Sequence, residues 1–175
     1  LVVMGIAEPC LYFLLETSAL QYTTAGQAGV ITATLPLLAS VAAFLILKER
    51  IGKPQIIGFI IAILGCSGLS MAAQNGEHAS NPLLGNTLEF LAMICGAVYS
   101  TSIRKLSTRY SALVLTSFQA FVGVIFFGPL ALQHDMPANI PLFQWGNFVY
   151  LATIVTIGAY WLYNWAISRV PVALA

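Results

Sequence analysis

Long apolar stretches separated by short polar segments follow one another along the whole chain. Each stretch has about the twenty residues that an α-helix needs to cross a bilayer. The pattern predicts six membrane helices, at residues 1–20, 25–47, 54–72, 84–103, 111–132 and 144–168, and a seventh that begins near Pro171. The stretch 25–47 carries no charge, whereas Glu8, Pro9 and Glu16 interrupt the first one. Because neighbouring helices can satisfy the carbonyl that a proline frees, Pro9 and Pro36 predict kinks rather than helix ends.

The composition also indicates a membrane protein. Hydrophobic residues make up 59% and charged residues 7%, against about 25% charged in an ordinary globular domain. A chain of 175 residues cannot bury so many apolar side chains, so lipid must cover much of its surface. A net charge of +1 without a long basic run excludes nucleic acid as an expected partner. The three cysteines show neither zinc nor disulfide spacing, and we expect no metal and no cofactor.

The basic residues are unevenly distributed over the connections. All seven Lys and Arg fall on one side if the helices alternate, in 48–53, in 104–109 and at Arg169. The opposite connections, around 73–83 and 133–143, contain acidic residues and both histidines but no Lys or Arg. By the positive-inside rule, the basic loops face the cytoplasm. We therefore predict a multi-pass protein of the bacterial inner or plasma membrane.

Two segments at the ends of the chain are weakly similar. Shifted by 147 positions, "YFLLETSALQYTTAGQA" (12–28) aligns with "AYWLYNWAISRVPVALA" (159–175) and is identical at three positions. In the predicted topology the first segment runs from inside to outside and the second from outside to inside. Similar segments of opposite orientation are typical of the inverted repeats of secondary transporters. We therefore expect the chain to represent part of a protein of about twice that repeat length.

A set of residues between positions 19 and 65 carries a family resemblance. It comprises Ala19-Leu20, Tyr22-Thr23, Ala25, Ala28, Pro36, Glu49-Arg50, Gly58 and Gly65. With them the stretch resembles the EamA-like branch of the drug/metabolite transporter superfamily, and residues 84–168 fit the start of that family's second half more loosely.

The resemblance implies an all-α polytopic membrane protein, part of a ten-helix bundle of two inverted five-helix repeats around a central cavity. On that map, residues 1–72 end the first repeat with helices three to five, and residues 73–83 form an outer loop. Residues 84–175 begin the second repeat with helices six to eight and the start of nine. The resemblance also implies a carrier for small metabolites, often an exporter. The Glu8-Pro9 pair lies outside the general family pattern.

Three glutamates lie within predicted membrane helices. An ionisable group near the helix centre costs roughly 2.5–3.5 kcal/mol, so such groups are candidates for function. Glu8, Tyr12 and Glu16 are spaced by four residues, which predicts one polar face turned away from lipid. These carboxylates, and Glu89 near the start of its helix, could bind an amino group or exchange a proton. The alternative is a protonated glutamate bonded to a neighbouring helix, and for Glu89 also a favourable interaction with the helix dipole.

Polar positions on two other helices give further candidates. The stretch 144–168 has a polar stripe at intervals of three or four residues, made of Thr153, Thr156, Tyr160 and Asn164. Tyr160 and Asn164 are the candidates for ligand contact, because threonines often bond their own backbone. The aromatic residues Trp161, Tyr163 and Trp165 of the same stretch predict an interfacial belt.

The stretch 25–47 presents Thr32 and Pro36 on one face. The carbonyl that Pro36 frees could bind substrate or allow a pivot, and a fixed packing kink is the alternative. Small residues at every fourth position, such as Ala92, Gly96 and Ser100, predict helix packing or a dimer face rather than a ligand site.

The leading hypothesis is a secondary transporter that works by alternating access without ATP. It would export small metabolites such as amino acids or related compounds. The expected partners are the lipid bilayer and a small-molecule substrate, with protons as a candidate coupling ion and a homodimer as a further arrangement. Its candidate substrate-binding residues are Glu8, Tyr12, Glu16, Thr32, Pro36, Glu89, Tyr160 and Asn164. We predict that it is not an enzyme, since no catalytic motif is present; the alternatives are a membrane-embedded enzyme or a non-catalytic membrane subunit.

Overall fold

The computed structural model of the chain describes residues 1–49, 51–73, 79–133 and 141–170. These residues form helices joined by short connections, with no strand among them. The elements are α1 (Val2–Gly5), η1 (Ile6–Leu11), α2 (Tyr12–Ala19), α3 (Ala25–Thr32), α4 (Leu35–Leu47), α5 (Lys53–Ala73), α6 (Pro82–Leu106), α7 (Ala112–Ala131), α8 (Leu142–Tyr150), η2 (Leu151–Ala159) and α9 (Tyr160–Ile167). The helix expected near Pro171 lies outside the described residues.

The first predicted helix is broken at Glu8. This residue has extended backbone angles, φ −146° and ψ 125°, and Pro9 follows it after a cis peptide bond. Proline cannot donate the backbone hydrogen bond that a continuous helix needs at this position. The predicted kink is therefore present, and Glu8 does not continue the helical face of Tyr12 and Glu16.

The second predicted helix is divided into α3 and α4. Thr24 begins α3, because its side chain accepts a hydrogen bond of 3.2 Å from the backbone N–H of Gln27. α3 ends at Thr32, and Pro36 occupies the first turn of α4, where a missing N–H costs nothing. At the other end of α4, Lys48 adopts a left-handed conformation with φ 57° and turns the chain toward α5.

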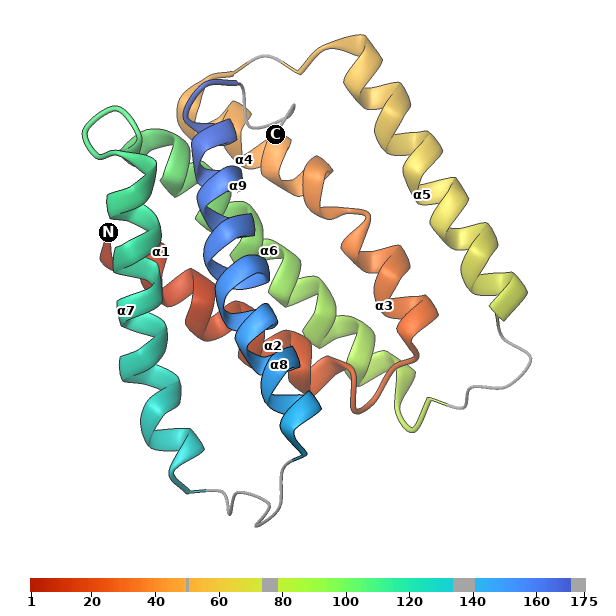
Figure 1. Cartoon of the computed structure of the whole chain (residues 1–175). Helices are drawn as coiled ribbons and strands as arrows, with labels where there is room; N and C mark the ends of the chain where they lie inside the picture. Colours follow the sequence, from red (N-terminus) through yellow and green to blue (C-terminus); the bar gives the residue numbers. More distant parts are fainter. Residues whose placement is uncertain (50, 74–78, 134–140, 171–175) are drawn as a thin grey trace.

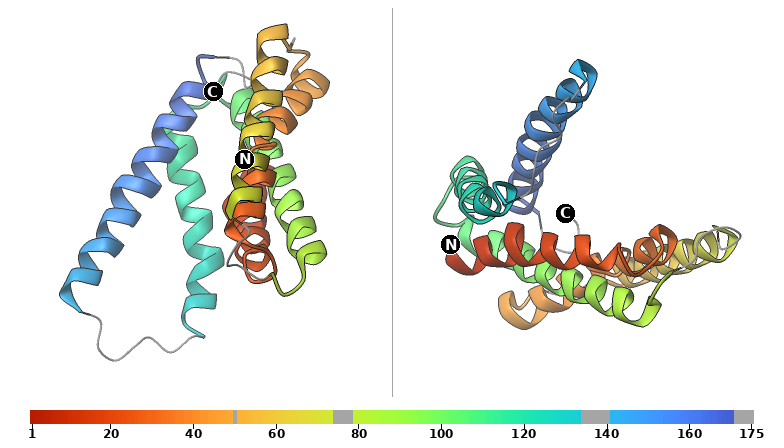
Figure 2. Two further views of the ribbon diagram at one scale, coloured as in Figure 1. Left: turned by 90° about the vertical axis from the view of Figure 1, so that its right-hand side faces the viewer. Right: turned by 90° about the horizontal axis from the view of Figure 1, so that it is seen from below.

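The long helix α6 is the centre of the bundle. It packs against α2, α3, α4 and the broken segment α1–η1, and together with α5, which packs on α3, these elements form a slab (Figure 2). From one side of the slab project α7 and the continuous helical segment α8–η2–α9, which approaches α6 at its α9 end and diverges from it toward α8 (Figure 2). The helix ends that carry the described Lys and Arg residues all lie at the upper end of the molecule in Figure 1.

The buried core is small for a chain of this length. One cluster joins Met4 and Ala7 to Tyr99 and Ile103 of α6, and another brings Ala39 and Ala43 of α4 against α6. Outside these clusters many large apolar side chains of α4, α5, α7 and α8 are exposed. Four helical stretches are long and apolar enough to cross a membrane, namely Val2–Ala19, Ala25–Leu47, Pro82–Leu106 and Ala112–Ala131, and α5 contains a shorter apolar stretch, Ile56–Gly65. The exposed apolar surface is therefore the surface of an all-α polytopic membrane protein.

Candidate functional site

A cavity of about 370 Å³ lies where the broken first helix meets α6 and α9. Its wall combines one carboxylate with four tyrosines and a serine, and consists of Glu8, Tyr12, Leu35, Gly96, Tyr99, Ser100, Ala159, Tyr160 and Tyr163. Its volume falls within the range of small-molecule sites, about 300–1,000 Å³. We refer to it below as the tyrosine cavity.

Glu8 reaches this cavity because the backbone is extended at that residue. Its side chain is 8% exposed, and its carboxylate accepts a hydrogen bond from the hydroxyl of Tyr160 on α9. The two residues are 152 positions apart in the sequence. None of the described Lys or Arg residues lines the tyrosine cavity, so this part of the chain places no cation there to offset an ionised Glu8.

A hydrogen-bonded network supports the tyrosines from behind. The hydroxyl oxygen of Tyr99 lies 2.6 Å from Oε1 of Gln119 and 2.8 Å from Oδ1 of Asn164, and Nδ2 of Asn164 donates to Thr116 Oγ1 at 2.9 Å. A hydroxyl has one hydrogen to donate, so the Gln119 side chain satisfies both contacts when its amide is turned to donate to Tyr99. The network joins α6, α7 and α9 and holds Tyr99 in place.

Tyr163 and Ser100 complete the wall. Their hydroxyl groups are 2.7 Å apart, and the ring of Tyr163 is stacked on that of Tyr99 with 6.3 Å between centroids. Tyr160 meets Tyr99 edge-on at 6.4 Å. Both arrangements are favourable for aromatic pairs, so the rings form a rigid aromatic surface beside Glu8.

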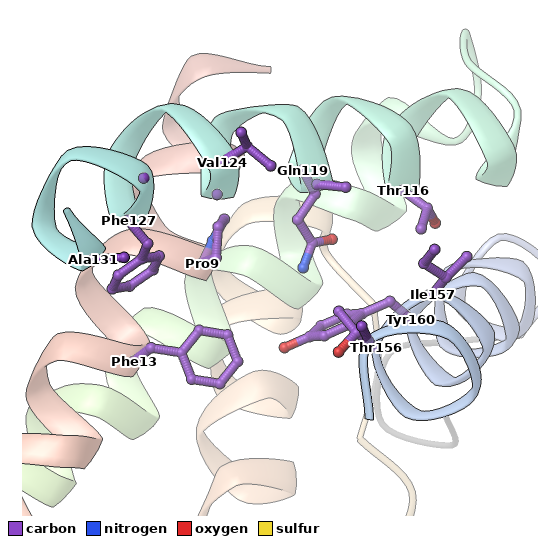
Figure 3. A pocket seen from close by; sticks show the side chains of 14 residues that line it. Pro9, Phe13, Thr116, Gln119, Val124, Phe127, Ala131, Thr156, Ile157 and Tyr160 are labelled. Atoms are coloured by element: carbon purple, nitrogen blue, oxygen red, sulfur yellow. The ribbon is translucent and has the colours of Figure 1, made fainter. Parts of the chain in front are cut away.

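A second, larger cavity of about 570 Å³ adjoins the first. It lies between η1–α2, α7 and η2–α9 and is lined mainly by apolar side chains, among them Pro9, Phe13, Val124, Phe127 and Ile157 (Figure 3). Gln119 from α7 and Tyr160 from α9 bring polar atoms into it (Figure 3). Tyr160 lines both cavities and is hydrogen-bonded to Glu8, so it connects the apolar space to the tyrosine cavity.

A second group of acids lies apart from the tyrosine cavity. The hydroxyl of Tyr12 donates to Oε1 of Glu16 at 3.0 Å. On α6, Glu89 is 1% exposed and its Oε1 lies 2.9 Å from the hydroxyl of Thr32 on α3. Tyr12 thus contacts both the cavity and this acidic group. Within the described residues, no group of three or more His, Cys, Asp or Glu side chains is placed to hold a metal ion.

Arg104 joins three helix ends at the basic end of the bundle. Its Nε donates to Glu49 Oε1 at 3.1 Å, and its Nη1 donates to the backbone carbonyls of Ile167 and Ser168, each at 3.1 Å. Carbonyls at a helix C-terminus have no partner within the helix, so the guanidinium satisfies two of them at the end of α9. The contact ties the end of α4 to α6 and α9.

The eight predicted site residues thus separate into groups. Glu8, Tyr12 and Tyr160 line the tyrosine cavity, and Asn164 supports it from behind. The acidic group near the start of α6 comprises Glu89, Thr32 and Glu16. Pro36 is exposed and lies outside both cavities.

Six residues of the cavity wall were not predicted from the sequence, namely Leu35, Gly96, Tyr99, Ser100, Ala159 and Tyr163. Gly96 and Ser100 belong to a row of small residues assigned to packing alone, yet they also line the cavity. Tyr163 was assigned to the interfacial belt and instead contacts Ser100. Tyr99 was not among the predicted residues, although a tyrosine inside an apolar helix, next to that row of small residues, indicates a buried polar group. By contrast, Thr153 and Thr156 bond their own helix backbone, at 2.6 and 2.8 Å, as threonines in helices often do.

The fold and the cavity define a polytopic helical membrane protein with a buried, carboxylate-bearing site. A match to the EamA-like transporter family covers residues 1–71 and 83–175. The chain belongs to this family, which confirms the resemblance noted from the sequence.

Several curated proteins are similar to the chain. The Uncharacterized transporter YetK of Bacillus subtilis is 30% identical over 159 residues, which cover 89% of this chain and 48% of that protein. The Uncharacterized transporter YcxC of the same organism is 27% identical, over 95% of this chain and 56% of that protein. A protein named Probable terminal-alkyne amino-acid exporter from Streptantibioticus cattleyicolor is 25% identical, over 87% of this chain and 50% of that protein. The chain therefore spans about half the length of these relatives. A search of solved structures gave no significant match.

Proposed function

We propose that this chain forms part of a secondary carrier that moves small amino compounds, such as amino acids, across the membrane without ATP. The observation that carries the proposal is a buried glutamate in a cavity walled by four tyrosines. A buried carboxylate requires a positive partner or a proton, and none of the described basic side chains lines the cavity. The ammonium group of a substrate would supply that charge.

The residues of the cavity have distinct roles in this proposal. Glu8 binds the ammonium group, and Tyr160 orients the carboxylate through its hydrogen bond. The faces of the tyrosine rings add cation–π attraction, worth about 0.5–2 kcal/mol. Ser100 and Tyr163, whose hydroxyls lie at the wall, would donate to a substrate carboxylate or hydroxyl.

The wider architecture in the proposal follows the family. Residues 1–72 would end one five-helix repeat and residues 84–175 begin an inverted second one, with the basic end in the cytoplasm. The family match is interrupted at residues 72–82, where a boundary between repeats would lie, and one relative is named as a probable amino-acid exporter. Both observations support export of amino compounds by alternating access.

The hydrogen-bonding of Glu8 also supports a carrier rather than an enzyme. A hydrolytic carboxylate dyad needs a second acid that shares a proton with the first. In the described residues Glu8 is hydrogen-bonded to a phenol, Tyr160, and the relatives above are named as transporters. We therefore propose that the protein has no catalytic activity.

Counterflow in proteoliposomes tests the proposal. The natural full-length protein is reconstituted with a panel of radiolabelled amino acids and amines, and with matched acids that lack the amino group. We expect flux for amino compounds alone. Removing one member of a buried charged pair costs about 2 kcal/mol or more, so Glu8→Gln should weaken substrate binding roughly 30-fold.

Glu16→Gln is the matched control, because Glu16 lies outside the cavity wall. It should retain the preference for amino compounds. Wild-type flux and an unchanged preference in Glu8→Gln would remove Glu8 from recognition and the proposal with it.

A further inference from the structure

Glu89 is the most deeply buried acid among the described residues, and it does not line the tyrosine cavity. It lies on α6 with 1% of its surface exposed, and its Oε1 is 2.9 Å from the hydroxyl of Thr32 on α3. Its Oε2 is buried and has no hydrogen-bond partner among the described residues. A buried ionised carboxylate oxygen without a donor is strongly destabilising, so the charge state of this group needs an explanation.

Counting hydrogens at Thr32 gives that explanation. The Thr32 hydroxyl lies 3.0 Å from the backbone carbonyl of Ala28 as well as 2.9 Å from Glu89 Oε1. It has one hydrogen and can donate to one of these acceptors at a time. If Glu89 is ionised, the contact to which Thr32 does not donate brings two oxygen atoms together with no hydrogen between them. If Glu89 carries a proton on Oε1, it donates to Thr32, and Thr32 donates to Ala28, so every contact is a hydrogen bond.

A protonated Glu89 also explains why its Oε2 is buried without a hydrogen-bond donor among the described residues. The proton on Oε1 leaves Oε2 as a neutral carbonyl oxygen, which costs far less to bury without a donor than half of a carboxylate does. The protonated form therefore satisfies the whole local geometry, and the ionised form leaves two groups unsatisfied.

The charges on the surrounding elements favour the same form. α2, which packs on α6, contributes Glu16 and Tyr12, and like charges on neighbouring helices repel each other. From the other elements packed on α6, η1 contributes Glu8 and the Cys10 thiol, and α9 contributes Tyr160 and Tyr163, whereas α1, α3 and α4 have no titratable side chain. The described Lys and Arg residues are confined to the ends of the helices.

We infer that Glu89 is a proton-binding site, at which the carrier takes up and releases a coupling proton during transport. The inference rests on the proposed carrier function, and it assigns protons as the coupling ion. Release of the proton leaves a carboxylate, and the Thr32 hydroxyl then rotates from Ala28 to donate to Oε1. The hydrogen bond within α3 is then lost, and the bond between α3 and α6 reverses its direction, with Thr32 as the donor, so the protonation state changes how the two helices are joined.

Tyr12 and Glu16 connect this site to the substrate. Tyr12 lines the tyrosine cavity and donates to Glu16 at 3.0 Å, and both residues lie on α2, which packs on α6 beside Glu89. A substrate ammonium group bound at Glu8 adds positive charge on this side of α6. The proton on Glu89 is then released more readily, which gives exchange of a proton for a cationic substrate.

Infrared spectroscopy of the full-length protein in lipid nanodiscs tests the site independently of transport. We expect a C=O stretching band of a protonated carboxyl group that is lost at every pH in Glu89→Gln and is retained at low pH in Glu16→Gln. The band should weaken as the pH rises. Thr32→Val, which removes the acceptor, should shift the band to the frequency of a free carboxyl, whereas Thr32→Ser should leave it in place. Absence of a Glu89-dependent band, or a band that never titrates, would overturn the inference.

Transport separates this inference from the function on which it rests. In proteoliposomes a pH gradient should drive substrate accumulation by the wild type, and Glu89→Gln should abolish that response, so that any remaining exchange is independent of pH. An equal response to the gradient in both proteins would reject the coupling site and leave the carrier function standing. If no amino compound moves in the wild type, the proposed function fails, while the infrared band still reports on Glu89.

Discussion

Gly85 of α6 is the position where the structure tolerates a side chain least. A Cβ atom placed there would lie 2.7 Å from both the backbone N and the Cβ of Thr23, and 2.9 Å from the carbonyl carbon of Tyr22. These atoms belong to the turn between α2 and α3, which is fastened to the start of α6 by the bond from Asn81 N–H to Tyr22 O at 3.1 Å. Gly85→Ala therefore forces this turn away from α6.

The cost of Gly85→Ala follows from that geometry. Restoring ordinary contact at 3.4 Å requires a shift of about 0.7 Å, and the atoms opposed are mostly backbone, which cannot relax by changing rotamer. Overpacking of this kind costs about 1–3 kcal/mol, and we expect the upper half of the range. Alanine regains about 1 kcal/mol through its helix propensity. The net loss is about 1–2 kcal/mol, or roughly 2–8 °C in Tm for a protein of this size.

Thermal melting in detergent measures this loss, with Gly29→Ala as the matched control. A Cβ at Gly29 of α3 would meet no atom within 4 Å, so the same chemical change there should leave Tm unchanged or raise it slightly. A Gly85→Ala protein that melts at or above the wild type would show that α6 and the α2–α3 turn do not approach as closely as described.

Three further predictions concern other parts of the bundle. Tyr99→Phe leaves buried amide groups without a partner and should lower the stability by about 1–3 kcal/mol, measured as a lower Tm; an unchanged Tm would mean that the network contributes nothing. Arg104→Lys loses the planar group that binds one carboxylate and two carbonyls, so it should melt earlier than the wild type, whereas Lys105→Gln at an exposed position should not. Single cysteines at Gln21 and Arg169 should react with impermeant reagents from opposite faces of the membrane, and labelling from one face would contradict the topology.

The membrane class and most helix positions were predictable from the sequence, because both depend on local properties. A segment that crosses lipid must satisfy its own backbone hydrogen bonds and present apolar side chains. Each span can therefore be predicted from its own residues. The predicted ranges 84–103 and 111–132 agree with α6 and α7 to within a few residues at each end. The gathering of Lys and Arg at one end of the bundle was predictable for the same reason.

The composition of the site was decided by tertiary structure. Helical periodicity placed Glu8 on one face with Tyr12 and Glu16, but the extended backbone at Glu8 takes it off that face and brings it to Tyr160, 152 residues away. The partners of Tyr99 on α7 and α9, and the approach of Thr32 to Glu89, depend on how helices cross, which no single helix encodes. An apolar stretch predicts that a helix lies in the membrane. The packing of neighbouring helices determines which of its few polar groups form hydrogen bonds with one another.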